Sequence, residues 1–222
     1  MKYKCLVLDH DDTVVQTEKT IGYPYFRDYL AKIRPGVDLS YPDYVRHCNN
    51  MVFADMCREQ WQMTEAELAE EYTGWKAYSR VNVPEVCRGI GEVIRRQKET
   101  GGLVCVSSLS TREIIERDFL YHFGCLPDAI YDYDLPTHQR KPNPYALEDM
   151  MARFGLQPEE ILMVDDMKLG YLMANAVKVP TAFAAWSKQD FPDLSREMRE
   201  LADFTFDSPA QLEAFLFEEE PK

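Results

Sequence analysis

The sequence of 222 residues has few basic side chains, and this shortage limits the partners that it can bind. Lysine and arginine together number 25 against 38 acidic residues, which gives a formal net charge of −13 at pH 7. Because attraction to phosphates supplies most non-specific affinity for nucleic acids, a chain this acidic is not expected to bind DNA or RNA. The same charge repels a phosphorylated metabolite, so any phosphate site needs local cations, either lysine or a bound metal.

The sequence also lacks long apolar runs and closely paired cysteines. The first apolar stretch, within MKYKCLVLDHDD, ends in acids and is too short for the apolar segment of a signal peptide or for a membrane span. The six cysteines are spread along the chain, which argues against a CxxC zinc site and against a dense disulfide framework. We therefore expect a soluble, cytoplasmic protein with free thiols and no membrane partner.

The composition is that of a globular protein, with 45% hydrophobic and 28% charged residues. The length is consistent with one core and an insertion. Short apolar runs that end in polar residues recur along the chain and predict β-strands. They lie at residues 3–8, 103–106, 129–131 and 161–164, and two runs interpreted as edge strands lie at 181–184 and 204–206.

Helical patterns separate these runs. A capping box of Ser110 and Glu113 marks the start of one helix, and Pro84 stands near the start of another. The expected helices span residues 84–100, 110–123, 145–154 and 169–177, with a last one after Pro209. Strands that alternate with helices predict an α/β fold with a doubly wound, parallel-sheet Rossmann-like core, whose ligands bind at the carboxyl ends of the strands.

Residues 17–83 interrupt this alternation. They carry aromatic and acidic residues at helical spacing but no aliphatic strand, so they predict an inserted all-helical domain. Thr64 and Glu67 are expected to form a capping box within it. We therefore expect two domains, a core of residues 1–16 and 84–222 and a helical domain of residues 17–83.

The segment Asp9-His10-Asp11-Asp12-Thr13 directly follows the first predicted strand. Residues two apart on an extended chain point the same way, so Asp9 and Asp11 are placed to face one reacting centre. Two such carboxylates can divide the work of a nucleophile and of a general acid/base. The alternative is that these acids only solvate and cap the end of a strand.

Three further groups are expected at the same sheet edge. Asp165 and Asp166 follow the strand at 161–164, where they suit Mg²⁺ or, alternatively, the positive end of a helix dipole. Ser107 ends the strand at 103–106, where its hydroxyl can hold a phosphate oxygen or merely cap a turn. Lys141 can supply the cation that a phosphate needs, or remain a solvated surface group. The joint arrangement favours the functional interpretations, because four independent coincidences would otherwise be required.

These residues resemble the pattern of the haloacid dehalogenase superfamily, which is a DxDx[TV] segment, a Ser or Thr that ends a strand, a Lys and an acidic pair. The corresponding segments here are LVLDHDDTVV, LVCVSS, RKPNPYAL and ILMVDDMKLG, in that order. The resemblance covers residues 1–16 and 84–210. The insertion at 17–83 looks like the helical cap of this superfamily, which closes over the active site.

The resemblance implies that Asp9 is a nucleophile that forms an aspartyl-phosphate and that Asp11 is the general acid/base. The dehalogenase branch lacks the second acid, so Asp11 argues for phosphoryl transfer. The implied activity is that of a Mg²⁺-dependent phosphatase that hydrolyses a small phosphorylated metabolite. The other implied roles are phosphate binding by Ser107 and Lys141, and metal binding by Asp166 with Asp165, by Asp9 and by the Asp11 backbone carbonyl.

The resemblance leaves the substrate open, because in this superfamily the shape of the cap rather than the four motifs sets specificity. His10 stands where the family is most often apolar, so it either lines the substrate pocket or packs under the cap. Sugar-phosphate mutases of the superfamily carry a cap His near the position of Thr20 and Ile21, so hydrolysis is favoured over a mutase or phosphotransferase. A non-catalytic phosphate-binding regulatory protein is the remaining alternative. The candidate substrate residues of the cap are Tyr23, Arg46, His47, Asn49 and Asn50.

Overall fold

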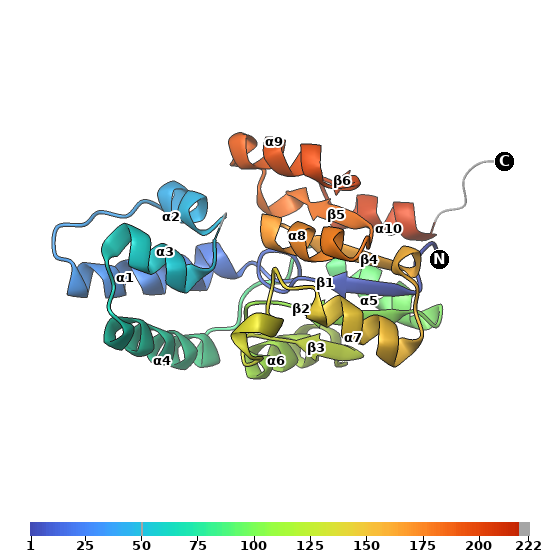
Figure 1. The fold of residues 1–222 in the computed structure, drawn as a ribbon, viewed down its shortest axis with the longest axis horizontal. Helices are drawn as coiled ribbons and strands as arrows, with labels where there is room; N and C mark the ends of the chain where they lie inside the picture. The colour runs from blue at the N-terminus through green and yellow to red at the C-terminus, as the bar shows by residue number, and fades with distance from the viewer. Residues whose placement is uncertain (50, 218–222) are drawn as a thin grey trace. The chain divides into compact units, whose positions relative to one another are not determined.

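The computed structural model describes residues 1–49 and 51–217 of the chain (Figure 1). They form two compact units. The first, called here the core unit, contains Met1–Val15 and the described chain from Val86 onward, and the second, the helical unit, contains Gln16–Glu85. Among the described residues no helix is long and apolar enough to cross a membrane.

The core unit is built on a six-stranded parallel sheet, as the sequence predicted. The order of its strands is β3-β2-β1-β4-β5-β6. The strands are β1 (Cys5–Leu8), β2 (Leu103–Ser107), β3 (Ala129–Tyr131), β4 (Ile161–Asp165), β5 (Thr181–Ala184) and β6 (Phe204–Phe206). The expectation that residues 181–184 form an edge strand was wrong, because β5 pairs with β4 on one side and β6 on the other.

Helices cover both faces of the sheet (Figure 1). Side chains alternate along each strand, so Leu6 and Leu8 join one core cluster while Cys5 and Val7 join the other. Burial on both faces explains why the strands are continuous apolar runs. On the first face lie α5 (Ile90–Glu99), α6 (Arg112–Phe123) and α10 (Pro209–Phe217). On the second lie α7 (Tyr145–Phe154), α8 (Lys168–Ala176) and α9 (Pro192–Leu201).

Two predicted helix starts were wrong. Helix α5 begins at Ile90 rather than near Pro84, because Gly89 adopts a φ of 99° and Val86 forms an isolated antiparallel bridge with Val15. Helix α6 begins after Thr111, which caps it without a side-chain hydrogen bond.

The predicted Ser110–Glu113 capping box is therefore absent at the start of α6. Ser110 instead belongs to the turn after β2, where its backbone N–H donates to Ser108 Oγ at 3.1 Å. The helix still ends as the sequence predicted, since Gly124 adopts the left-handed conformation that follows many helices.

The helical unit contains no strand among its described residues, which agrees with the predicted insertion. The predicted capping box is present: Glu67 N–H donates to Thr64 Oγ1 at 3.3 Å, and Thr64 N–H donates to Glu67 Oε2 at 2.8 Å. The elements are a short π-helix η1 (Glu18–Gly22), α1 (Tyr23–Ile33), α2 (Tyr41–Cys48), α3 (Phe53–Trp61) and α4 (Glu65–Val81).

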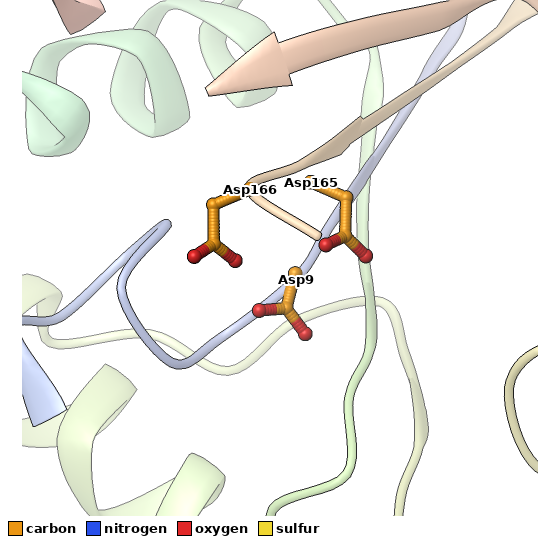
Figure 2. A group of neighbouring side chains, drawn as sticks. All are labelled: Asp9, Asp165 and Asp166. Atoms are coloured by element: carbon orange, nitrogen blue, oxygen red, sulfur yellow. The ribbon is translucent and has the colours of Figure 1, made fainter. Parts of the chain in front are cut away.

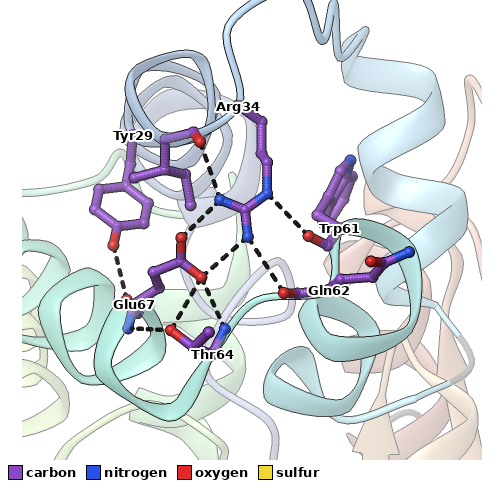
Figure 3. A network of polar contacts seen from close by, with 7 residues as sticks. Tyr29, Arg34, Trp61, Gln62, Thr64 and Glu67 are labelled. Carbon is purple, nitrogen blue, oxygen red and sulfur yellow. Dashed lines mark hydrogen bonds and ion pairs between the residues drawn. The ribbon is translucent and has the colours of Figure 1, made fainter.

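Arg34 joins three helix ends of this unit (Figure 3). Its guanidinium donates to both oxygens of Glu67, at 2.6 and 3.0 Å, and to the carbonyl oxygens of Trp61 and Gln62. The hydrogen bond from Arg34 is the main reason why the pKa of Glu67 falls to about 2. The end of α1 is thereby tied to the end of α3 and the start of α4.

Candidate active site

The candidate site lies where the strand order of the sheet reverses. From the central pair β1 and β4, the chain extends through β2 and β3 on one side and through β5 and β6 on the other. Sheets of this kind bind ligands beyond the carboxyl ends of the two central strands. Asp9 directly follows β1, and its backbone N–H donates to the Val164 carbonyl oxygen at 2.9 Å, while Asp165 ends β4. Strand pairing therefore brings Asp9 and Asp165 together.

Three buried carboxylates meet at this point, from Asp9, Asp165 and Asp166 (Figure 2). One oxygen of each lies within 4.8 Å of the others. The three residues are between 1% and 5% exposed. Like charges this close and this deeply buried require positive charge nearby.

Lys141 supplies part of that charge. Its ammonium donates to Asp9 Oδ1 at 2.6 Å and to Asp165 Oδ2 at 2.7 Å, and the residue is buried. Burial lowers the pKa of Lys141, but the carboxylates of Asp165 and Asp9 outweigh burial and raise this pKa above its ordinary value. Lys141 therefore remains charged and joins the ends of β1 and β4.

The Asp165 carboxylate is fixed from a second direction. Its Oδ1 accepts a hydrogen bond from the Met167 backbone N–H at 2.8 Å. Helix α8 passes so close to it that a Cβ atom on Gly170 would overlap the carboxylate. Glycine at position 170 therefore makes room for the side chain that Lys141 holds.

Lys188 is a second buried lysine of the site, and the sequence analysis missed it. Its Nζ lies 2.6 Å from Asp166 Oδ2 and 3.8 Å from Asp12 Oδ2. The residue is 4% exposed. It follows the turn Ala185–Ser187 directly after β5, so its only signal in the sequence was a place shortly after a predicted strand.

The loop after β1 turns sharply. The backbone N–H groups of Val14 and Val15 donate to the His10 carbonyl oxygen at 2.9 and 3.1 Å, and Asp12 N–H donates to the Val15 carbonyl at 2.6 Å. Asp12 has a φ of 57°, a left-handed conformation in which Asp is enriched. Asp11 is half-buried and lies outside the three-carboxylate cluster, so its role as general acid/base and metal contact stays a prediction.

Comparison with known families decides the affiliation of this chain. The family model of haloacid dehalogenase-like hydrolases matches residues 6–184, which include Asp9, Lys141 and the acidic pair. The chain belongs to this family. Among curated proteins no significant match was found.

Solved structures with the fold of this hydrolase share little sequence with it. A protein of Haemophilus somnus described as a predicted phosphoglycolate phosphatase is 17% identical, with a TM-score of 0.75 over 97% of this chain and 99% of that one. A mutant of CbbY from Rhodobacter sphaeroides, in complex with xylulose-(1,5)-bisphosphate, is 15% identical, with a TM-score of 0.72 over 95% and 96%. A candidate β-phosphoglucomutase of Bacteroides vulgatus is 16% identical, with a TM-score of 0.74 over 97% and 88%. At sequence identities this low, the similarity to these structures shows a shared fold and nothing more.

Ser107 of the hydrolase ends β2 beside the segment that begins at Asp9. The register pairs Leu8 with Val106, so Ser107 stands next to Asp9 in the sheet. Ser107 is 2% exposed, and its Oγ lies 3.8 Å from Met173 Sδ. Its predicted contact with a phosphate oxygen stays a prediction.

His10 of the hydrolase is fully buried in the core unit. Its Nε2 lies 3.0 Å from Asp118 Oδ2 on α6, and its ring stacks on Phe119 with centroids 6.2 Å apart. Arg117 in turn donates to Asp118 Oδ1 at 2.8 Å. The side chain therefore faces α6 in the core, and nothing in these contacts supports a direct substrate contact.

The predicted substrate residues of the insertion lie in the helical unit. Arg46 is exposed, and its guanidinium lies 3.8 Å from Asp43, while His47 packs edge-on against Trp61 with centroids 5.5 Å apart. Their roles stay predictions, as do those of Tyr23 and Asn49, and Asn50 lies outside the described residues.

The clustered acids fit a divalent cation. Asp166 Oδ1 is buried and has no hydrogen-bond partner among residues 1–49 and 51–217. Burial raises the pKa of Asp9 above its ordinary value and that of Asp165 to about 7, although Lys141 lowers both. Carboxylates that their neighbours leave incompletely neutralised are the ligands that Mg²⁺ prefers. Asp9, Asp165 and Asp166 are therefore the candidate metal ligands.

Proposed function

We propose that this hydrolase is a Mg²⁺-dependent phosphatase that releases phosphate from a small phosphorylated metabolite. The observation that carries the proposal is the buried Lys141 ammonium between Asp9 and Asp165, beside three clustered carboxylates. In a chain with a net charge of −13, such a local cation is what a phosphate group requires. The contact between this ammonium and Asp9 supports the proposed role of Asp9 as the nucleophile.

In the proposed reaction, a carboxylate oxygen of Asp9 attacks phosphorus. The bond between phosphorus and the leaving oxygen breaks, and Asp11 gives its proton to that oxygen. Asp11 then takes a proton from water, the water oxygen attacks phosphorus, and the bond to Asp9 breaks to release phosphate. When bound, Mg²⁺ would offset the repulsion between Asp9 and the phosphate.

The remaining groups bind and orient the phosphate. Lys141 donates to the transferring phosphoryl group while it keeps Asp9 in position, and Ser107 at the end of β2 donates its hydroxyl to another phosphoryl oxygen. Asp165 and Asp166 would hold the metal, together with Asp9 and the Asp11 backbone carbonyl. The helical unit acts as a cap that admits substrate and then excludes bulk water.

Two of the solved structures support the substrate class. One is described as a predicted phosphoglycolate phosphatase and the other holds a sugar bisphosphate, so both names concern small phosphorylated metabolites. The mutase alternative is weaker, because Thr20 stands near the position of the mutase histidine and donates its hydroxyl to the Gln16 carbonyl oxygen at 2.7 Å.

The first test is phosphate release from p-nitrophenyl phosphate and a panel of phosphorylated metabolites in the presence of Mg²⁺. We expect turnover by the wild type, none by Asp9→Asn, and complete loss in excess EDTA. Undiminished activity in EDTA would remove Mg²⁺ from the proposal. Transfer of phosphate to a second position of a sugar, with no stoichiometric inorganic phosphate, would establish the mutase instead.

Asp11→Asn separates an enzyme from a binding protein. A phosphatase should lose turnover by about 10²-fold or more, because general acid/base help is removed. A regulatory protein that only binds phosphate should keep its phosphate affinity in this variant and show no turnover in the wild type.

A further inference from the structure

The ammonium of Lys188 contacts one oxygen of Asp166, which is one of the three clustered carboxylates. Its Nζ is 2.6 Å from Asp166 Oδ2, while Asp166 Oδ1 is buried without a hydrogen-bond partner among the described residues. Ser187 adds only a long contact to Oδ2, with its Oγ at 3.5 Å. The two oxygens of Asp166 therefore differ, since Lys188 holds Oδ2 and no described residue donates a hydrogen bond to Oδ1.

Lys188 differs from Lys141 in what it holds. Lys141 bridges Asp9 and Asp165, which is the arrangement of a lysine that positions a nucleophile. Lys188 pairs instead with Asp166 and, at 3.8 Å, with Asp12. Both side chains of the closer pair are at most 5% exposed, so water screens this charge little.

The fixed charge of Lys188 acts on a cation and on an anion in opposite ways. When all three clustered carboxylates are ionised, they carry one net negative charge together with Lys141 and Lys188, and they would carry two without Lys188. A divalent cation is therefore held less tightly when Lys188 is present. The same ammonium strengthens the binding of a phosphate dianion to the site once the cation is in place.

We propose that Lys188 is a positioning residue that, through Asp166, lowers the affinity of this site for its divalent cation and raises the affinity of the loaded site for phosphate. The single fixed charge therefore shifts the two affinities in opposite directions. This inference rests on the proposed metal site but not on turnover.

The test compares wild type with Lys188→Met and Lys188→Gln by isothermal titration calorimetry with Mn²⁺, without substrate. Both variants remove the charge, and Gln keeps an N–H donor for Asp166. We expect both to bind Mn²⁺ at least tenfold more tightly than the wild type, which corresponds to about 1.4 kcal/mol. Inorganic phosphate, titrated into the Mg²⁺-saturated protein, should bind at least tenfold more weakly to both.

Unchanged or weaker Mn²⁺ binding by both variants would overturn the proposal. Weaker binding by Lys188→Met with wild-type binding by Lys188→Gln would also overturn it, because the hydrogen bond to Asp166 rather than the charge would then matter. Unchanged phosphate affinity would overturn its second part. Circular dichroism establishes whether each variant is folded. If Lys188→Met does not fold, Lys188→Gln alone provides the test.

Lys98→Met is the matched control. Lys98 pairs with Asp128 at 3.1 Å, and Asp128 accepts from the Val104 N–H at the amino-terminal end of β2, so this lysine lies at the opposite end of the sheet from Asp9. The Lys98→Met variant removes the same formal charge as the Lys188 variants and should leave the affinity for Mn²⁺ unchanged. Because these measurements need no substrate, an inactive protein that shows the Mn²⁺ effect would refute the phosphatase and keep the role of Lys188.

Discussion

Replacing Glu71 by Gln should stabilise the helical unit at neutral and alkaline pH. Glu71 lies on α4 and is 5% exposed, and its backbone carbonyl accepts from the Tyr25 hydroxyl at 3.0 Å. Burial raises the pKa of its carboxyl from an ordinary 4.5 to about 7. The folded unit therefore favours the neutral carboxylic acid, which Gln imitates in shape and in charge.

The size of the effect follows from the two pKa values. The folded state binds the proton more tightly than the unfolded state, so the stability that protonated Glu71 confers is complete below pH 4.5 and is lost as pH rises through 7. The difference between the two pKa values corresponds to about 3 kcal/mol of stability that is lost when Glu71 is ionised. The free energy of unfolding of Glu71→Gln should therefore exceed that of the wild type by more at pH 8 than at pH 5, and the difference should be roughly 2 to 3 kcal/mol.

The assay is urea unfolding at both pH values, followed by tryptophan fluorescence. Trp61 and Trp75, two of the three tryptophans, lie in the helical unit. Glu70→Gln is the control, because Glu70 is exposed and pairs with Lys32 at 2.8 Å, so it should show no such gain. Equal differences between Glu71→Gln and wild type at pH 5 and pH 8 would refute the reasoning.

Three further predictions concern positions that hold the site or the fold. Gly170→Ala should force the Asp165 carboxylate to move, lowering the melting temperature by an amount equivalent to about 1 to 3 kcal/mol and reducing Mn²⁺ affinity in calorimetry; unchanged metal binding would contradict the contact described for Gly170. Lys141→Met should reduce kcat for phosphate release by about 10² to 10³-fold in steady-state assays, because it removes the cation that contacts Asp9, whereas a drop in substrate affinity alone would limit Lys141 to binding. Thr64→Ala should cost about 1 kcal/mol in urea unfolding, because the N-cap bond to Glu67 is lost, and a wild-type midpoint would show that the cap contributes nothing.

The sequence predicted the centre of the site because the relevant signals are local. Asp9 and Asp165 each end a short apolar run, and parallel pairing of β1 with β4 then places them together. Lys141 was singled out as a possible cation for a phosphate, and its place in the order of the family pattern agreed with this. The sheet itself was predictable because burial on both faces leaves continuous apolar runs.

Features that depend on contacts distant in sequence were missed. Pro84 is typical of a helix start, but Val86 pairs with Val15, and this long-range bridge overrides the local preference. Lys188 resembles any surface lysine until β5 is paired beside β4, which brings the end of β5 next to Asp166. His10 was predicted to contact either substrate or cap, and its buried partner Asp118 is 108 residues away.

The bridge between Val15 and Val86 makes the two ends of the insertion neighbours. Cys87 N–H also donates to the Val14 carbonyl oxygen at 2.9 Å, and Gln16 N–H donates to the Glu85 carbonyl at 2.8 Å. The two ends of the inserted segment are held next to each other, so folding pays a loop-closure entropy cost for this segment. That cost grows only slowly with the length of the segment. Insertions of very different size are therefore tolerated there, so evolution can exchange the segment between these ends while the buried charges of the sheet stay unchanged.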